Sequence, residues 1–410
     1  MKNLIIFLLL FASVISAQSS KVLSGADVLL KDSLHLIENK NIGIITNHTG
    51  ILSNSVHIVD TLNSLENVNV VVLFGPEHGI RGDAPDGQTI TDGKDSKTGI
   101  QVYSLYGKTR KPTPEMLKNV DLLIFDIQDI GARYYTYIST MYFAIQSAAE
   151  NNIPILILDR PNPINGIRVE GPLTADNFQS FVAIAKIPIV HGMTVGELAR
   201  LFNEENFIKT ERRAELNIIK MENWKREMYF DETGLPWIKP SPNMPFLETA
   251  LVYPGLCLIE GTNVSEGRGT QNPFLQIGAP YIDQKKLIEK LDSYNLEGIK
   301  YNSIEYTPIE IPNMSSKPKH EGKICNGIEL QITDRNNFDA LKFGIILIHS
   351  IMHLHPDDFE FRKGSIDRLS GSENLRTMLT KGFSPEQIFN TWQNELEEFK
   401  LLRKKYLIYN

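Results

Sequence analysis

The stretch VDLLIFD, at residues 120–126, is an apolar run that ends abruptly in a carboxylate. Three other apolar runs also end abruptly, in a polar or Gly/Pro segment: IGIIT at 42–46, VNVVVLF at 68–74 and IPILILD at 153–159. Short apolar runs bounded by polar, Gly or Pro residues are typical of strands buried on both faces of a parallel sheet. Ahead of the last run, residues 139–150 place Met141, Ile145 and Ala148 on one helical face. This alternation of strand and helix predicts an α/β fold with a Rossmann-like, mostly parallel sheet.

Polar side chains follow each of the four runs. In parallel sheets of this kind, ligands bind beyond the carboxyl ends of the strands, where the loops converge on one crevice. Asp, Asn, Gly and Pro are also ordinary turn residues, so for any single loop a purely structural role explains them equally well. Four such loops together favour a polar, sugar-like binding site. The candidates are Asn47, His48, Glu77, His78, Asp126, Gln128, Arg133, Arg160 and Asn162.

The chain is long enough for two domains. Single hydrophobic cores stop growing near roughly 250–300 residues, and this chain has 410. A Pro-rich connection at 235–245 is too rigid for a flexible linker, and we place the domain boundary just after it. We expect the Rossmann-like domain at 21–250 and a smaller α+β domain at 251–410. The net charge of −7 and the lack of a basic block disfavour a nucleic-acid-binding protein.

The first residues have the pattern of a secretory signal peptide. Lys2 precedes an apolar run at 4–14, and the small residues Ser16 and Ala17 precede a polar segment. The run is shorter than the ~20 residues that a bilayer span needs, which disfavours the alternative of an uncleaved anchor. We therefore expect a signal peptide at 1–17 and a mature protein without a stable membrane span. Such a protein is exported, and is either periplasmic or secreted.

Several common cofactor and metal motifs are missing from the sequence. No G-x-G-x-x-G follows the run at 42–46, so neither NAD nor another cofactor is expected. G-x-S-x-G and H-E-x-x-H are absent too, which removes the usual indications of a serine hydrolase or a zinc protease. Cys257 and Cys325 lack the C-x-x-C spacing of a zinc or redox site, and their spacing leaves open whether they pair. No metal site is predicted.

A Gly-rich segment at 260–270 carries Glu260, Glu266 and Arg268. Glycine at this density lets the backbone approach a ligand closely. The lysine and the spacing of a phosphate-binding P-loop are missing. A carboxylate-bearing loop that faces the first domain is therefore the better interpretation, and an ordinary surface loop is the alternative.

Two pairs of residues have the spacing of helix capping boxes. Thr194 with Glu197 predicts a helix at 195–203, and Ser384 with Gln387 predicts the start of a C-terminal helix. Both motifs are structural.

Seven strings of residues carry a family resemblance. They are FGPEHGIRG at 74–82, VYSLYG at 102–107, FDIQDIGAR at 125–133, LDRPNP at 158–163, VEGP at 169–172, HGMT at 191–194 and the Gly-rich segment at 260–269. Together, and in this order, they resemble the NamZ/YbbC family of exo-β-N-acetylmuramidases, glycoside hydrolase family 171. The resemblance extends from about residue 42 to the C-terminus. It implies two domains with a site in the cleft between them. It also implies removal of N-acetylmuramic acid (MurNAc) from the non-reducing end of peptidoglycan fragments such as MurNAc-GlcNAc, during cell-wall turnover and recycling.

Glycoside hydrolysis usually needs two carboxyl groups, one of which protonates the leaving oxygen. Glu77 is our candidate for the essential carboxyl, because it follows a central strand and matches the glutamate of the family's Gly-Pro-Glu-His-Gly motif. The second carboxyl is less well defined. We favour Glu266, while Glu170, Glu260 and Asp126 stay open. Retention, inversion and substrate-assisted attack by the 2-acetamido group are all compatible with the sequence.

MurNAc differs from N-acetylglucosamine by a lactyl ether that carries a carboxylate. A guanidinium binds a carboxylate through two parallel hydrogen bonds, so an arginine is expected to recognise this group. Arg160 and Arg268 are the leading candidates, followed by Arg81 and Arg133. Hydrogen bonds to hydroxyl and amide groups are expected from Asn47, His48, Gln128 and Asn162.

Two other classes of function stay open at this point. An exported sugar-binding protein would have the same domains and the same polar cleft. A metal-assisted amidohydrolase acting on cell-wall glycans would use His48, His78 and Asp126 as ligands. The sequence does not define the oligomeric state or the preferred glycan length.

Overall fold

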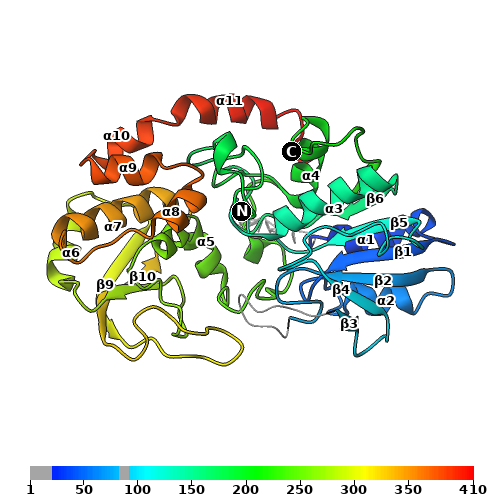
Figure 1. The fold of residues 1–410 in the computed structure, drawn as a ribbon, viewed down its shortest axis with the longest axis horizontal. Coiled ribbons are helices and arrows are strands. Elements are labelled where there is room, and N and C mark those ends of the chain that lie inside the picture. The colour runs from blue at the N-terminus through cyan, green and yellow to red at the C-terminus, as the bar shows by residue number, and fades with distance from the viewer. Residues whose placement is uncertain (1–20, 83–91) are drawn as a thin grey trace, which may run out of the picture.

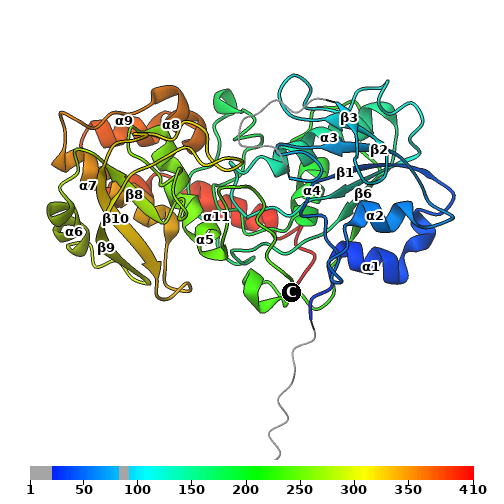
Figure 2. The same cartoon turned by 90° about the horizontal axis from the view of Figure 1, so that it is seen from below.

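A computed structural model describes residues 21–82 and 92–410 of the chain (Figure 1). The predicted signal peptide at 1–17 lies outside the described residues. Two domains lie side by side, the first on the right of Figure 1 and the second on the left. Figure 2 shows the same arrangement from below. Within the described residues, no helix is both long and apolar enough to cross a bilayer.

The first domain is built on a seven-stranded sheet with the order β3-β4-β2-β1-β5-β6-β7. Every neighbouring pair is parallel except β3 with β4. The strands are β1 (Asn41–Thr46), β2 (Asn69–Gly75), β3 (Gly93–Lys94), β4 (Gln101–Ser104), β5 (Leu122–Asp126), β6 (Ile155–Leu158) and β7 (Leu216–Ile219). The four apolar runs form β1, β2, β5 and β6. The predicted Rossmann-like sheet is therefore confirmed.

Both faces of this sheet are buried, because successive side chains of a strand point to opposite faces. Leu123 and Phe125 belong to one hydrophobic cluster, whereas Leu122 and Ile124 belong to another. Helices α3 and α4 cover the first face, and α1 and α2 cover the second. Their bounds are α1 (Gly25–Asp32), α2 (Ile58–Asn63), α3 (Tyr137–Asn151) and α4 (Val195–Glu204).

The second domain has a three-stranded antiparallel sheet with the order β8-β10-β9. Its strands are β8 (Gln276–Ala279), β9 (Ile299–Tyr306) and β10 (Cys325–Ile332). Its helices are α5 (Leu247–Leu256), α6 (Gln284–Asp292), α7 (Ala340–Leu354), α8 (Lys363–Ser370), α9 (Asn374–Thr380), α10 (Pro385–Asn390) and α11 (Gln393–Arg403). Short 3-10 turns also occur, among them η4 (Cys257–Gly261). The predicted smaller α+β domain is confirmed. Its two cysteines, Cys257 and Cys325, are buried free thiols and do not pair.

Both predicted capping boxes are present. Thr194 and Glu197 cap α4, and Ser384 and Gln387 cap α10. The C-terminal helix is interrupted after Asn390, so that it forms α10 and α11.

The end of the chain returns to the first domain. Helix α11 runs across the top of Figure 1 from the second domain toward α4, and the C-terminus lies beside the first domain. Arg403 donates to the Gly192 carbonyl at 2.7 Å, and the Tyr409 hydroxyl donates to Asp159 at 2.6 Å. Residues 403–410 therefore bind the two domains together.

Candidate active site

The usual ligand crevice of a Rossmann-like sheet is closed in this protein. The strand order reverses between β1 and β5, which is where such sheets normally bind their ligands. The Pro-rich segment 235–240 covers this point. His48 is hydrogen-bonded to the Lys239 carbonyl at 2.8 Å, and Tyr137 donates to the Pro240 carbonyl at 2.6 Å. Only about 20 Å³ of space is left beside Gln128 and Arg160. That volume is too small for a sugar ring.

Five of the predicted site residues support the loops around this closed crevice. Asp126 and Arg160 form a buried ion pair at 2.5 Å. Asn47 accepts hydrogen bonds from the backbone and hydroxyl of Thr49. Gln128 and Asn162 donate to the carbonyls of Pro161 and Met193, respectively. These contacts satisfy buried polar groups within the first domain. None of these five residues lines the large pocket described below, and neither does His48.

Two further candidates also lie outside that pocket. Arg133 is completely buried and donates to three backbone carbonyls, one of them that of Leu369 in the second domain. Glu170 pairs with Arg168 at 2.7 Å, and burial raises the pKa of Glu170 to about 8. The sequence placed both residues near the substrate. In the structure, Arg133 joins loops of the two domains, whereas Glu170 forms its ion pair with Arg168 of its own loop.

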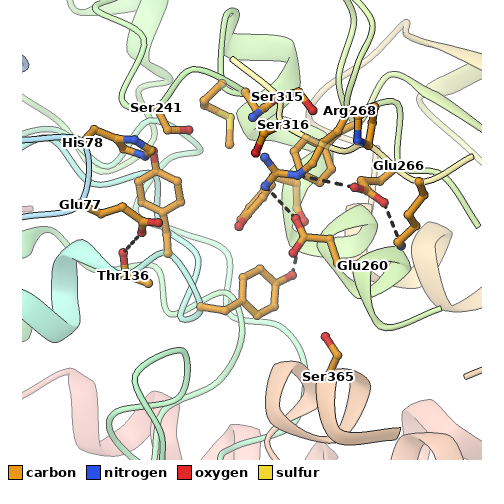
Figure 3. Close-up of a pocket in the computed structure, with 18 of the residues that line it drawn as sticks. Glu77, His78, Thr136, Ser241, Glu260, Glu266, Arg268, Ser315, Ser316 and Ser365 are labelled. Atoms are coloured by element: carbon orange, nitrogen blue, oxygen red, sulfur yellow. Dashed lines mark hydrogen bonds and ion pairs between the residues drawn. The ribbon is translucent and has the colours of Figure 1, made fainter. Parts of the chain in front are cut away.

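A pocket of about 390 Å³ lies between the two domains. It brings together five of the predicted site residues, two from the first domain and three from the second. These are Glu77, His78, Glu260, Glu266 and Arg268. Figure 3 shows Glu77 and His78 on one side of the pocket and the two other glutamates with Arg268 on the opposite side.

The wall from the first domain is the turn that follows β2. His78 and Gly79 have φ angles of 73° and 74°, which lie in the left-handed region. This conformation is uncommon for a residue with a side chain, and such strain persists where the surrounding structure holds it. The turn directs the half-buried Glu77 toward the pocket, where its carboxylate accepts a hydrogen bond from the Thr136 hydroxyl at 3.2 Å.

The wall from the second domain is the Gly-rich segment after η4. Gly267 has a φ of 78°, and a Cβ atom at this position would lie 2.5 Å from the Gln276 carbonyl oxygen. Only glycine fits this turn without a shift of the backbone. The turn places Glu266 and Arg268 next to Glu260. Arg268 pairs with Glu260 at 2.9 Å and with Glu266 at 3.5 Å.

The two glutamates of this wall have different electrostatic environments. Burial raises the pKa of Glu260, and the nearby Glu266 raises it further, although Arg268 counteracts both. Burial would also raise the pKa of Glu266. Lys319, 2.9 Å away, and Arg268 outweigh that effect, so its pKa is below the ordinary value. Neighbouring carboxyls whose pKa values are separated in this way are typical of acid and base pairs in enzymes.

Much of the pocket lining could not be predicted from the sequence. Besides Tyr134 and Tyr135, which follow Arg133 directly, the additional residues are Thr136, Tyr137, Ser241, Asn243, Met244, Tyr253, Phe274, Ser315, Ser316, Lys317, Pro318, Lys319, Arg362 and Ser365. Most of them come from the second domain, which has no strand-end pattern to mark them. The proline-rich spacing of 240–245 was the only signal, and it indicated a rigid connection.

A metal-dependent mechanism has no preformed ligand set in the part of the chain that the structure describes. No group of three His, Cys, Asp or Glu side chains is arranged there to hold a metal ion. The ligand set proposed for an amidohydrolase, with His48, His78 and Asp126, is therefore not assembled.

Comparison with known proteins identifies the family. Residues 42–248 match the N-terminal domain of exo-β-N-acetylmuramidase NamZ, and residues 251–409 match its C-terminal domain. The peptidoglycan β-N-acetylmuramidase NamZ of Bacillus subtilis (strain 168) is 49% identical over 395 residues, which are 96% of this chain and 93% of that protein.

Two solved structures from Bacteroides fragilis NCTC 9343, both described as DUF1343 family proteins, have the same fold. The first is 36% identical with a TM-score of 0.88, and the second is 34% identical with a TM-score of 0.76. Each comparison covers 95% of this chain and 99% of the other. The predicted family is thus confirmed, and the chain belongs to the exo-β-N-acetylmuramidase NamZ family.

Proposed function

We propose that this protein is an exo-β-N-acetylmuramidase, which hydrolyses the β-1,4 bond of a non-reducing terminal MurNAc in peptidoglycan fragments. The observation that carries the proposal is the interdomain pocket, where Glu77 faces Glu260 and Glu266 from opposite walls. Family membership along nearly the whole chain supports the same activity.

The chemistry requires a proton donor and an anionic group near an oxocarbenium-like transition state. Glu77 is the essential carboxyl in this proposal. It is half-buried and reaches the pocket from a strained turn, which holds it in one orientation. Glu266 supplies the anion, because Lys319 and Arg268 keep it ionised. Glu260, whose pKa is raised, is protonated more readily than an ordinary glutamate.

Product analysis tests the proposal. Purified protein is mixed separately with MurNAc-β-1,4-GlcNAc and with the reverse disaccharide, GlcNAc-β-1,4-MurNAc, and the products are identified by mass spectrometry. We expect both monosaccharides from the first substrate only. Glu77→Gln should reduce this release at least about 1,000-fold, because loss of a catalytic group typically costs several orders of magnitude. Glu115→Gln, at an exposed position outside the pocket, is the matched control.

The alternative of a sugar-binding protein gives a different result. Both disaccharides would then survive the wild-type protein while one of them still binds, for example in a calorimetric titration. That outcome would reject the proposed hydrolysis before any single residue is reassigned.

Export is a separate part of the proposal. Lys2, the apolar run at 4–14 and the small residues before position 18 support a cleaved signal peptide. N-terminal sequencing of the protein recovered from outside the cytoplasm tests it. A first residue at or near Gln18 is expected, and an intact Met1 would contradict cleavage.

A further inference from the structure

The pocket carries more positive than negative charge. Among its described lining residues, three carboxylates face four cationic side chains, those of Arg268, Lys317, Lys319 and Arg362. Two of these cations already bind the carboxylates of the Gly-rich wall. Arg268 pairs with Glu260 and Glu266, and Lys319 pairs with Glu266. The charges in this part of the pocket are therefore balanced without a ligand.

Arg362 differs from these two cations. Arg362 lines the pocket and is exposed, and no ion pair among the described residues includes it. Lys317 is exposed in the same way. A pocket with two cations that lack a carboxylate partner is suited to a substrate that brings its own negative charge.

The backbone of Arg362 is held firmly in place. Its N–H donates to the Gly261 carbonyl at 2.8 Å, directly after Glu260. A Cβ atom on Gly261 would lie 2.6 Å from Cβ of Ile366, so α8 packs closely against this segment. Arg362 stands at the start of α8. The backbone of Arg362 is therefore fixed against the segment that carries Glu260, at the edge of the pocket.

We propose that Arg362 binds the lactyl carboxylate of MurNAc and so determines the specificity for MurNAc over N-acetylglucosamine. This inference rests on the proposed muramidase function. A guanidinium matches a carboxylate through two parallel hydrogen bonds, whereas the ammonium of Lys317 acts as a single charge. Arg362 is thus the principal contact and Lys317 a weaker one.

The arginines that the sequence favoured for this role have other partners. Arg160 binds Asp126, Arg81 binds Asp60 and Asp95, and Arg133 is completely buried. Arg268 lies in the pocket but neutralises two glutamates. The position of Arg362 could not be found from the sequence, because it lies outside the motifs and almost 100 residues from the Gly-rich segment.

The test compares three p-nitrophenyl β-glycosides: that of MurNAc, that of MurNAc whose lactyl carboxylate is converted to a neutral amide, and that of N-acetylglucosamine. For the MurNAc glycoside, Arg362→Ala should lower kcat/KM about 10- to 100-fold, which is the range expected for lost hydrogen bonds to a charged group. The same substitution should change kcat/KM for the neutral amide by less than about twofold. That substrate lacks the carboxylate, so it does not form the ion pair with Arg362 that the substitution removes. Arg362→Lys should restore part of the loss.

Lys363→Ala is the matched control. It removes an exposed positive charge from the adjacent residue, which does not line the pocket, and should leave all three kcat/KM values unchanged. If Arg362→Ala lowers kcat/KM equally for the charged and neutral substrates, or for neither, the assignment of Arg362 is wrong. If the wild-type protein hydrolyses none of the three glycosides nor the disaccharide MurNAc-GlcNAc, the proposed function itself fails.

Discussion

Asp129 is a buried carboxyl group near a strand end, and its burial changes its pKa. It follows β5, is 4% exposed, and accepts one hydrogen bond from the Gly131 N–H at 2.7 Å. Its other carboxylate oxygen has no hydrogen-bond partner among the described residues. Burial raises the pKa of Asp129 from 3.8 to about 7. The folded protein therefore keeps a proton on Asp129 at pH values where the unfolded chain loses it.

This pKa shift predicts that Asp129 makes stability fall as the pH rises. Below pH 4 the folded and the unfolded state both hold the proton. Between pH 4 and about pH 7 only the folded state holds it, so each pH unit in this window lowers the free energy of unfolding by up to ~1.4 kcal/mol. The full loss is on the order of 2–4 kcal/mol by pH 8.

Asp129→Asn cannot ionise, so the variant should lose this pH dependence. The amide can change the stability by an amount that does not depend on pH. Beyond that constant difference, we expect the urea midpoint of the variant to rise relative to wild type between pH 5 and pH 8. Asp176→Asn, at an exposed position, serves as the control. Parallel pH profiles of wild type and Asp129→Asn would show that the buried carboxyl is already ionised in the folded state.

Residues at strand ends also explain why the site was only partly predictable. The pattern of apolar run and polar loop identified Glu77 correctly as a loop residue at the carboxyl edge of the sheet. It could not separate Glu77 from Asp126, because one follows a buried strand and the other is the last residue of one. The difference arises from residues 235–240, which close the crevice above Asp126 and belong to a distant part of the chain.

At the scale of elements, prediction succeeded where the side-chain pattern was strong. Strands buried on both faces appear as continuous apolar runs, and β1, β2, β5 and β6 have that form. Strand β7 has only one buried residue of its four, and β4 likewise has one. Their short, mixed patterns resemble loops, so tertiary contacts decide their structure.

The two capping boxes give a prediction at this scale, because they have the same local chemistry in different surroundings. The Thr194 hydroxyl accepts from the Glu197 N–H and also donates to the buried Asp159 at 2.7 Å. Among the described residues, the one partner of the Ser384 hydroxyl is the Gln387 N–H, from which it accepts. Ser384→Ala should cost about 1 kcal/mol, the usual value of a lost cap. Thr194→Ala should cost roughly 2–4 kcal/mol, because Asp159 also loses a donor.

Urea unfolding of the two variants measures both values, with the slope of each transition checked against wild type. Thr194→Ser keeps the hydroxyl and should recover most of the loss. Equal costs for Thr194→Ala and Ser384→Ala would mean that the bond to Asp159 adds nothing to the stability.

At the scale of the whole molecule, the two domains share one hydrophobic core. A single cluster contains Phe74 and Leu198 of the first domain together with Ile277 and Ile346 of the second. The pocket lies between these domains, so its two walls keep their relative position only while the core holds the domains together. A shared core of this kind favours one cooperative unfolding transition.

The C-terminal tail should stabilise both domains at once. The Tyr409 hydroxyl donates to Asp159 at 2.6 Å and accepts from the Met221 N–H at 2.9 Å, and its ring packs against Trp224. Tyr409→Phe keeps the ring but removes the acceptor of the Met221 N–H and one of the donors to Asp159, which should cost about 1–3 kcal/mol.

Tryptophan fluorescence can follow this effect in each domain separately. One variant keeps only Trp224, in the first domain, and another keeps only Trp392, in the second, with the other tryptophans replaced by Phe. Because the core is continuous, Tyr409→Phe should lower the urea midpoint by the same amount in both reporter variants, each compared with its own parent that keeps Tyr409. Leu401→Ser, at an exposed position of α11, should change neither. A midpoint that falls for Trp224 while that of Trp392 stays fixed would show that the domains unfold independently, and the pocket would then depend on a weaker contact than the shared core suggests.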